Sequence, residues 1–155
     1  MSELRSIVLA IELATRQRDD LAKVVARTRR TLGGAQHQMA QLQGYAGETD
    51  ARWSSPNYVA LSAELIRHHY QFTARLQQAI VLQTDAISKA NRQVELTAQA
   101  LLQAEFRLAG LKQVLETRQA AQQLTQRRRE QRLTDEFAGM QHARTRVRTM
   151  SGETI

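Results

Sequence analysis

Residues 76–115 read LQQAIVLQTDAISKANRQVELTAQALLQAEFRLAGLKQVL. Apolar residues in this run recur at alternating intervals of four and three, the heptad spacing of a helix that packs along a narrow seam on another helix. The seam has twelve positions, ten of them apolar: Leu76, Ile80, Gln83, Ile87, Ala90, Val94, Thr97, Leu101, Ala104, Leu108, Leu111 and Leu115. Upstream, Leu65 and Phe72 join this seam only if the heptad phase shifts near Phe72–Ile80, which predicts a stutter.

The N-terminal part of the chain carries a second heptad pattern. Its seam has fourteen positions, eleven of them apolar: Leu4, Ile7, Ile11, Ala14, Arg18, Leu21, Val25, Thr28, Leu32, Ala35, Met39, Leu42, Ala46 and Thr49. A seven-residue repeat of this length favours a left-handed supercoil over an ordinary surface helix. Gly33-Gly34 lies inside the pattern and predicts a gentle kink, because each glycine costs about 1 kcal/mol relative to alanine in a helix.

Turn-forming residues gather between the two heptad patterns. They are Gly44, Gly47, Asp50, Ser54, Ser55, Pro56 and Asn57. Pro56 is the only proline in the chain, and proline terminates helices. We therefore place the only turn at about 48–57 and expect Ser55 or Asn57 to cap the next helix.

These signals predict an all-α fold, in which two long helices form an antiparallel coiled-coil hairpin with an overhanging C-terminal helix. We expect one domain over residues 1–155, with a first helix at about 3–47, a turn at about 48–57, a second helix at about 58–147 and a frayed tail at 148–155. The composition agrees, because a chain with 5% aromatic residues suits long helices that touch along seams better than a thick globular core.

The unequal lengths of the two helices predict a stretch without an intramolecular partner. A turn centred near residue 53 places Leu4 opposite residues 102–106, so that everything after about Leu108 lies alone. The apolar residues expected to be exposed on this lone helix are Leu108, Leu111, Leu115, Leu133 and Phe137. Exposed apolar residues of this kind typically mark a binding surface.

Positive charge concentrates in the same stretch. The chain carries a formal net charge of +7, and residues 118–150 hold eight arginines against three acidic residues, or five of those seven charges. An acidic protein partner is one interpretation of this basic run. Nucleic acid is a second, although no aromatic platform or groove-reading motif accompanies the arginines, and a solvated helix face is a third.

Aromatic residues crowd the expected turn end of the hairpin. They are Tyr45, Trp53, Tyr58, Tyr70 and Phe72. They either plug the tip where the helices splay or form a patch that binds a partner, since aromatic residues dominate binding hot spots.

No enzyme signature accompanies these features. The chain has no cysteine, and the adjacent His68 and His69 point about 100° apart on a helix, so they cannot share a metal ion. Gly33-Gly34 lacks the lysine and spacing of a phosphate-binding loop, and Asp135-Glu136 is typical of a solvated acidic pair. We expect no catalytic residue, metal, cofactor or small-molecule substrate. The longest apolar runs are too short to span a bilayer, and the N-terminus lacks a signal-peptide layout, which predicts a cytosolic protein.

Several segments together resemble the flagellar export protein FliJ family over about residues 4–144. They are Asp19-Asp20, Gln41-Leu42-Gln43-Gly44-Tyr45, Tyr70-Gln71-Phe72 with Leu76 and Ala79-Ile80, and the basic stretch from Arg127 that ends in Asp135-Glu136-Phe137-Ala138. Thr49 and Thr73 depart from the pattern, because the family often has a bulkier residue at these two positions.

The resemblance implies a non-enzymatic component of the bacterial flagellar type III export apparatus. Such proteins are antiparallel coiled coils that act as the central stalk of the hexameric flagellar export ATPase. They also contact the cytoplasmic domain of the export-gate protein FlhA and handle export chaperones. The implied location is cytoplasmic, with peripheral association with the inner membrane at the flagellar basal body.

By position, the resemblance assigns two sets of binding residues. The set implied for the ATPase is Arg127, Arg128, Arg129, Arg132, Leu133 and Phe137. The set implied for the export gate is Gln38, Leu42, Tyr45, Phe72, Leu76 and Ala79. The alternatives are a stalk subunit of a virulence type III secretion system, a basic coiled coil that binds nucleic acid, and a homodimeric scaffold whose overhanging helices pair with each other.

Overall fold

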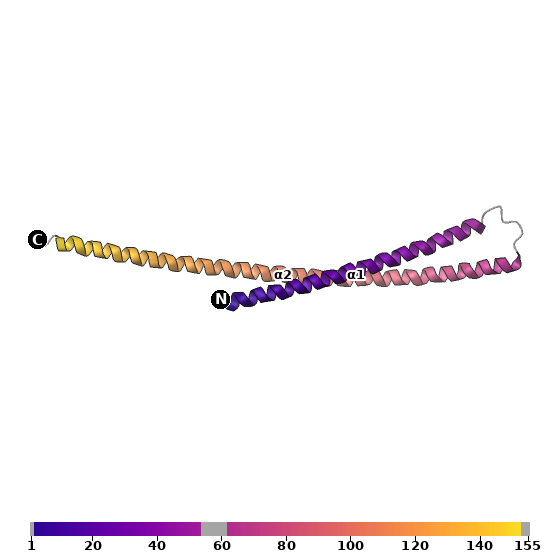
Figure 1. The fold of residues 1–155 in the computed structure, drawn as a ribbon, viewed down its shortest axis with the longest axis horizontal. Coiled ribbons are helices and arrows are strands. Elements are labelled where there is room, and N and C mark those ends of the chain that lie inside the picture. Colours follow the sequence, from indigo (N-terminus) through magenta and orange to yellow (C-terminus); the bar gives the residue numbers. More distant parts are fainter. Residues whose placement is uncertain (1, 54–61, 153–155) are drawn as a thin grey trace. The chain divides into compact units, whose positions relative to one another are not determined.

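The computed structural model describes residues 2–53 and 62–152, which form two helices. Helix α1 spans Ser2–Trp53 and helix α2 spans Ala63–Gly152 (Figure 1). No strand occurs in these two ranges. Because the two long helices pack against each other in opposite directions, the prediction of an all-α antiparallel hairpin is confirmed.

Ser62 caps the N-terminus of α2. Its side-chain Oγ accepts a hydrogen bond from the backbone N–H of Leu65 at 3.3 Å, and its carbonyl accepts one from Ile66 at 3.2 Å. This is the geometry of an N-cap serine, which satisfies N–H groups that have no partner within the helix. The expected caps, Ser55 and Asn57, lie outside the described residues, and α2 begins after both of them.

Both helices extend beyond their expected C-terminal ends. Helix α1 continues through Gly44 and Gly47 to Trp53, so the turn predicted to begin at residue 48 is not there. Packing outweighs the cost of the glycines, because Ala46, Thr49 and Trp53 continue the seam and are half-buried. Helix α2 likewise continues to Gly152, past the start of the predicted frayed tail. Residues 54–61, which include the expected start of the second helix, lie outside the described ranges.

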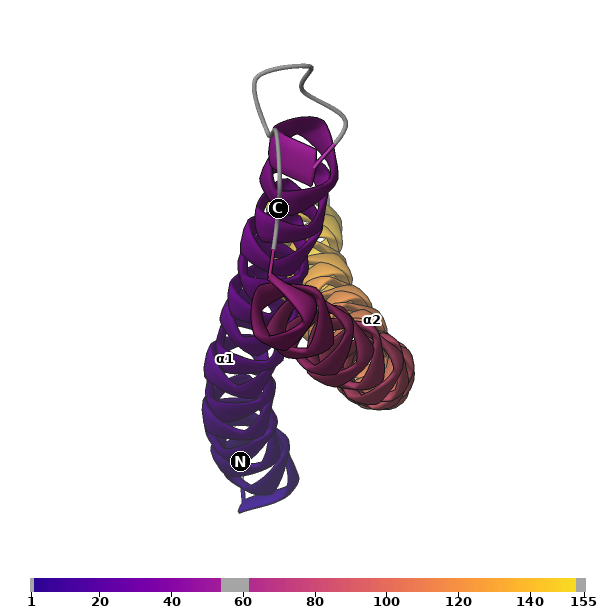
Figure 2. The ribbon, with the colours of Figure 1, turned by 90° about the vertical axis from the view of Figure 1, so that its right-hand side faces the viewer.

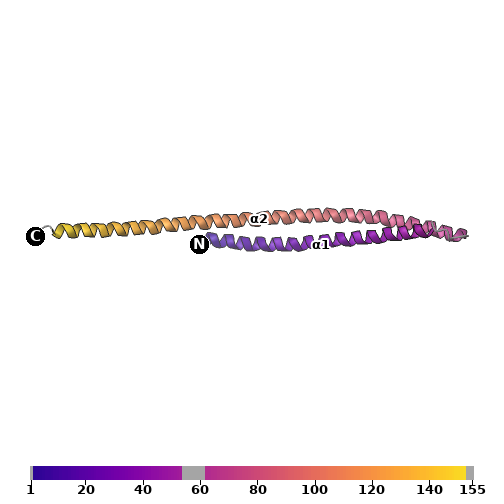
Figure 3. The ribbon, with the colours of Figure 1, turned by 90° about the horizontal axis from the view of Figure 1, so that it is seen from above.

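The chain divides into two compact units. One unit, called here the central unit, is Ala14–Arg107, and the other, the terminal unit, is Met1–Leu13 together with Leu108–Ile155. Within the central unit the paths of α1 and α2 cross in Figure 1 and lie side by side in Figure 3. Figure 2 looks at this hairpin from the end of α1 and the start of α2, and the two helices run at an angle to each other, as expected of a coiled coil.

The predicted seams are confirmed at every position. All fourteen seam residues of α1 and all twelve of α2 are buried or half-buried. The most deeply buried ones are small or medium-sized, and they are Ala14, Val25, Leu76, Ala90 and Leu108. Among the described residues no polar or charged residue is fully buried. A thin apolar seam of this kind, rather than a globular core, holds the helices together.

The predicted stutter near Phe72–Ile80 is wrong. The seam of α2 continues upstream of Leu76 with unbroken heptad spacing through Thr73 to His69, both half-buried. Leu65 and Phe72 lie off the seam and are 53% and 50% exposed. The two polar residues keep the seam in phase, while the two apolar residues remain available on the surface.

The predicted register of the hairpin is also wrong, by about two heptads. In the central unit the Thr28 and Thr97 hydroxyl oxygens lie 3.1 Å apart, and in the terminal unit Glu3 forms an ion pair with Arg118. The expected register placed Leu4 opposite residues 102–106, roughly fourteen positions lower. Since seam residues recur every seven positions, a shift of two heptads brings apolar residues onto apolar residues again.

The corrected register changes which leucines are free. Leu108 is only 4% exposed, and Leu111 and Leu115 are half-buried, although all three were expected on the lone helix. The exposed stretch of α2 therefore begins at Glu116, about one heptad beyond the predicted point.

Candidate functional site

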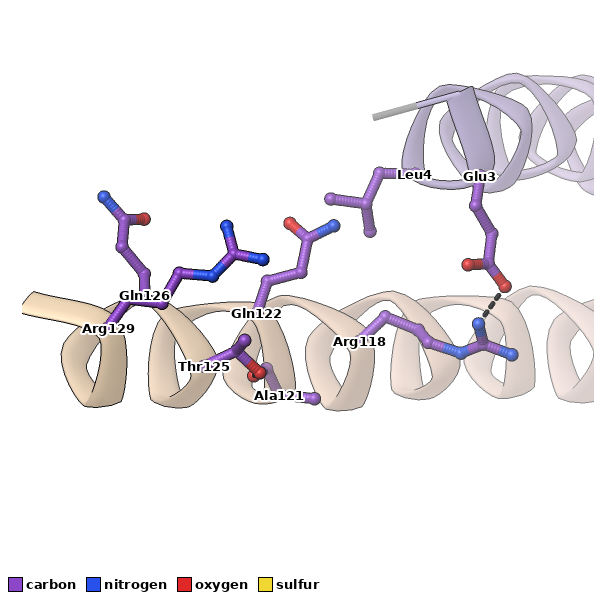
Figure 4. Close-up of a pocket in the computed structure, with 8 residues that line it drawn as sticks. All are labelled: Glu3, Leu4, Arg118, Ala121, Gln122, Thr125, Gln126 and Arg129. Atoms are coloured by element: carbon purple, nitrogen blue, oxygen red, sulfur yellow. Dashed lines mark hydrogen bonds and ion pairs between the residues drawn. The ribbon is translucent and has the colours of Figure 1, made fainter. Parts of the chain in front are cut away.

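The C-terminal stretch of α2, residues 116–152, is exposed at every position. It belongs to the terminal unit, whose part of α2 begins at Leu108. Helix α1 begins at Ser2, so it lies beside only the beginning of this part of α2 (Figures 1 and 3). The ion pair between Glu3 and Arg118 marks this end of the paired region (Figure 4). We call residues 116–152 the free helix.

A shallow groove lies where α1 begins. In Figure 4, Leu4 projects from α1 towards α2, and the Glu3 carboxylate reaches the guanidinium of Arg118. The groove is lined by Glu3, Leu4, Arg118, Ala121, Gln122, Thr125, Gln126 and Arg129. The start of α1 and the first four turns of the free helix thus form one mixed polar and apolar surface.

An apolar face follows on the free helix. Leu133, Phe137 and Met140 are spaced four and three residues apart, so they lie on one side of the helix. Each is 65% exposed, and Val147, one heptad beyond Met140, is 68% exposed. A hydrophobic strip of this kind on a water-exposed helix is typical of a surface that a second protein covers.

The arginines of the basic run surround this face rather than forming one side of the helix. Successive positions of an α-helix are about 100° apart, so Arg127, Arg128 and Arg129 point in three directions. Arg129 lies one turn before Leu133 on the same face. Arg132 directly precedes Leu133 in the sequence and therefore points about 100° away from it around the helix. Among the described residues, none of these four arginines pairs with a carboxylate. Their charges are therefore available to a partner.

A second candidate surface lies in the central unit, at the end of α1 and the start of α2. The rings of Trp53 and His69 stack with centroids 3.7 Å apart and planes 30° from parallel, and Tyr70 follows at 6.0 Å from His69. Beside this stack is a groove, here called the tip groove, lined by Tyr45, Glu48, Thr49, Arg52, Trp53, Leu65, His68, His69 and Phe72. Tyr45, Leu65 and Phe72 are each at least half exposed.

Residues 6–146 match the family described as FliJ, flagellar FliJ protein. The chain belongs to the FliJ family. No curated protein matches the chain. The FliJ family is non-catalytic, and its members have a role in flagellar protein export and associate with the export apparatus.

The structure of this FliJ-family chain places the six residues implied for ATPase contact on one segment. All six lie within three turns of the free helix, and all are exposed. Leu133 and Phe137 share a face with Arg129, whereas Arg127 and Arg128 point elsewhere. Met140 and Val147 extend the same apolar face, and they were not among the predicted contacts.

The six residues implied for the export gate divide into two groups. Gln38, Tyr45 and Phe72 are exposed, and Tyr45 and Phe72 line the tip groove together. Leu76 is buried in the seam, and Leu42 and Ala79 are half-buried. Gln38 is already engaged, because its Oε1 accepts a hydrogen bond from Gln83 at 3.1 Å. Only Tyr45 and Phe72 are therefore both exposed and adjacent to one groove.

Sequence reasoning missed Leu65, which joins Tyr45 and Phe72 in the tip groove. It was assigned to a shifted seam because it is apolar. Its spacing of seven from Phe72 is the signal that could have placed both residues on one exposed face.

In residues 2–53 and 62–152 no cluster of three His, Asp or Glu side chains is placed to hold a metal ion. Neither described helix is long and apolar enough to cross a membrane.

Proposed function

We propose that this FliJ-family chain acts as a central stalk of the hexameric flagellar export ATPase and connects the ATPase to the export gate. The observation that carries the proposal is the free helix, in which every residue is exposed while an apolar face and four net positive charges lie together. Exposing Leu133, Phe137 and Met140 to water is unfavourable, so a partner that covers them gains binding free energy.

The shape of the free helix suits a narrow binding site. A single α-helix with its side chains is about 10–12 Å across, and residues 116–152 rise roughly 55 Å at about 1.5 Å per residue. A central channel of an ATPase ring that is lined by acidic and apolar groups would complement both features. The arginines surround the helix, so they favour a host that surrounds it over a flat acidic surface.

The tip groove supplies the contact with the export gate in this proposal. Tyr45, Leu65 and Phe72 present aromatic and aliphatic surface around the Trp53–His69 stack. Aromatic anchors of this kind concentrate binding energy in protein interfaces. The cytoplasmic domain of FlhA is the proposed partner of the tip groove. Export chaperones are proposed as further binding partners of this FliJ-family chain.

Binding of the purified ATPase hexamer to the full-length chain tests the stalk assignment. Replacing both Leu133 and Phe137 by alanine is expected to weaken binding at least tenfold, because two exposed anchors are lost. Leu124→Ala is the matched control, since Leu124 is 50% exposed but lies on the opposite side of the free helix. Equal binding by the double variant and the control would overturn the stalk proposal.

The contribution of charge is separable from that of the apolar face. Changing Arg127, Arg128, Arg129 and Arg132 to glutamate is expected to abolish co-purification of the ATPase. The corresponding control is R144E/R146E/R148E, which reverses charge farther along the free helix. Loss of ATPase binding only in the variant changed at residues 127–132 would support a specific ATPase contact at residues 127–137. Equal loss in both variants would indicate only long-range electrostatic attraction between the chain and the ATPase.

Binding to the cytoplasmic domain of FlhA tests the tip. Y45A/F72A is expected to lose most of this binding while retaining the ATPase. Val81→Ala is the control, because Val81 is exposed on α2 and does not line the tip groove. Retention of gate binding by Y45A/F72A would separate the tip groove from the export gate. Membership of a flagellar family favours this assignment over a stalk of a virulence system.

A further inference from the structure

The apolar surface of α2 is wider than the seam. The positions that flank the seam on one side, seven residues apart, are Phe72, Ala79, Ala86, Gln93 and Ala100, and four of these five are apolar. The corresponding positions on the other side are Gln77, Thr84, Asn91, Ala98 and Glu105, of which only Ala98 is apolar. A helix of a two-stranded coiled coil usually carries charged residues on both flanks. Apolar residues on the seam and on one flank are typical of a helix that packs against two neighbours.

Helix α1 covers only part of this wider surface. Val24 and Thr31 of α1, which are seven residues apart, line a groove together with Ala86 and Gln93 of α2. Val24 is half-buried, and the other three are exposed although they flank the seam. The short side chains of Ala86 and Thr31 leave space beside the seam that a further helix would fill. We call this groove the middle groove.

A second groove of the same kind lies farther along the central unit. It is lined by Gln17, which belongs to the same line of α1 positions, and by Ala100 and Arg107, which continue the flanking line of α2. Positions seven residues apart share one side of a coiled-coil helix, so this adjoining groove and the middle groove open on the same side of the hairpin. Together they extend from Ala86 to Arg107, roughly 32 Å at about 1.5 Å per residue.

The middle groove is bordered by positive charge. Arg27 of α1 and Lys89 of α2 line it, and within residues 2–53 and 62–152 no acidic side chain does so. Among the described residues Arg27 pairs with no carboxylate. Lys89 pairs with Asp85 of its own helix, but these two side chains are 77% and 63% exposed. Solvent screens such a pair, so a carboxylate of a partner readily replaces Asp85.

The surrounding sequence adds to this charge. Residues 21–47 of α1 hold four Lys or Arg residues and no Asp or Glu. The adjoining groove holds one charge of each sign, Asp20 and Arg107. The excess of positive charge on this side of the central unit therefore lies at the middle groove.

These features favour an acidic helix as the occupant. A groove whose lining residues recur every seven positions matches an α-helix with the same repeat. A second copy of the chain is disfavoured, because a two-fold interface places the same surface of both copies together and would oppose Arg27 and Lys89 to like charges. A helix that carries carboxylates would instead complement them.

We propose that the middle groove and the adjoining groove together bind an acidic amphipathic helix of another protein, which packs on α1 and α2 as the third helix of a local three-helix bundle. Its apolar residues would cover Val24, Ala86 and Ala100, and its carboxylates would pair with Arg27 and Lys89. Neither the free helix nor the tip groove takes part. Failure of this proposal would therefore leave the ATPase and export-gate assignments unaffected.

The test uses the full-length chain and two synthetic helical peptides of about 21 residues, the length that spans both grooves. The acidic peptide carries leucine and isoleucine at heptad seam positions and glutamate beside them, and the basic peptide has lysine in place of every glutamate. We expect R27E/K89E to bind the acidic peptide at least about tenfold more weakly than the unchanged chain, and the basic peptide at least about tenfold more tightly. R29E/R92E is the matched control, since it changes the net charge equally at two exposed residues that do not line the groove.

A steric change tests the same site without altering charge. Ala86→Trp fills the middle groove, whereas Thr84→Trp places the same ring on the other flank of the seam. We expect Ala86→Trp to weaken binding of the acidic peptide at least about tenfold and Thr84→Trp to retain it, with equal helix content by circular dichroism.

Three results would overturn the proposal. Equal losses for R27E/K89E and R29E/R92E would indicate only long-range attraction. No binding of the acidic peptide, or binding that neither R27E/K89E nor Ala86→Trp alters, would exclude the groove and in the second case place the peptide elsewhere, as on the free helix. A dimer of the unchanged chain in sedimentation that Ala86→Trp abolishes would assign the groove to a second copy.

Discussion

The two parts of α2 are both helical, but they differ in heptad pattern and in exposure to solvent. From Leu76 to Leu115 the helix carries a complete heptad seam, and all twelve seam residues are buried or half-buried. From Glu116 to Gly152 the helix continues without a break, yet every residue is exposed. The seam fails there because Arg118 and Gln122 occupy its next positions. Alanine, glutamine, arginine and glutamate are good helix formers, so intrinsic propensity extends a helix that packing has already begun.

The comparison teaches that one helix can be stabilised by burial of a seam in one part and by intrinsic helix propensity in another. The paired part derives its stability from burial and resists change at its seam. The free helix contributes little to that stability, and its surface is therefore free to be selected for binding. Four experiments test this division.

The largest effect is expected from placing a charge in the seam. Leu108→Asp buries a carboxylate at a position only 4% exposed, and we expect a loss of about 3 kcal/mol or more in the free energy of unfolding by urea. Leu133→Asp makes the same chemical change on the free helix and is expected to alter stability by less than about 0.5 kcal/mol. Similar losses for the two variants would contradict the division.

Backbone hydrogen exchange sharpens the comparison without any mutation. Amides of residues 116–152 open by fraying, whereas amides of the paired part of α2 open only when the seam separates. We expect exchange in the free helix to be at least about a hundredfold faster than in residues 76–107, measured by mass spectrometry on the full-length chain. Uniform protection along α2 would show that the free helix is covered in solution, as a homodimeric scaffold requires.

A smaller effect is expected from the polar pair within the seam. T28V/T97V replaces two half-buried hydroxyls with methyl groups of similar shape, and we expect the free energy of unfolding to rise by about 1 kcal/mol. Thr117→Val is the control, because Thr117 is exposed and bonds only to its own helix. A fall in stability for T28V/T97V would mean that the hydroxyl pair stabilises the hairpin as well as selecting its register.

The smallest effect is expected at the end of α1. The side chains of Glu3 and Arg118 are 64% and 50% exposed, so solvent screens their ion pair. Glu3→Gln is expected to cost less than about 0.5 kcal/mol, and the difference is expected to vanish in about 1 M salt. Glu130→Gln, on the free helix, is the control. A larger loss that persists in salt would show that this contact anchors the start of α1.

The placement of the candidate binding residues was only partly predictable. The exposure of Arg127, Leu133 and Phe137 follows from the failure of the heptad seam after Leu115, which is visible in the sequence. The burial of Leu76 was equally visible, since it is a seam position, yet the family resemblance assigned it to a binding surface. Leu65 was missed because its apolar character suggested the seam, although the heptad spacing upstream of Leu76 leads to Thr73 and His69, and their burial shows that these two residues occupy the seam.

The heptad spacing by itself determined that the chain forms two long helices and which face of each is buried, because helix periodicity links sequence position directly to direction around the helix axis. It did not determine which turn of α1 meets which turn of α2. Every offset by whole heptads brings apolar residues together, so the repeat that specifies the seam leaves the register open. The contacts of Thr28 with Thr97 and of Gln83 with Ala35 select one register, and these contacts exist only in the folded hairpin. Tertiary structure therefore decided where the pairing stops and how much of α2 remains free.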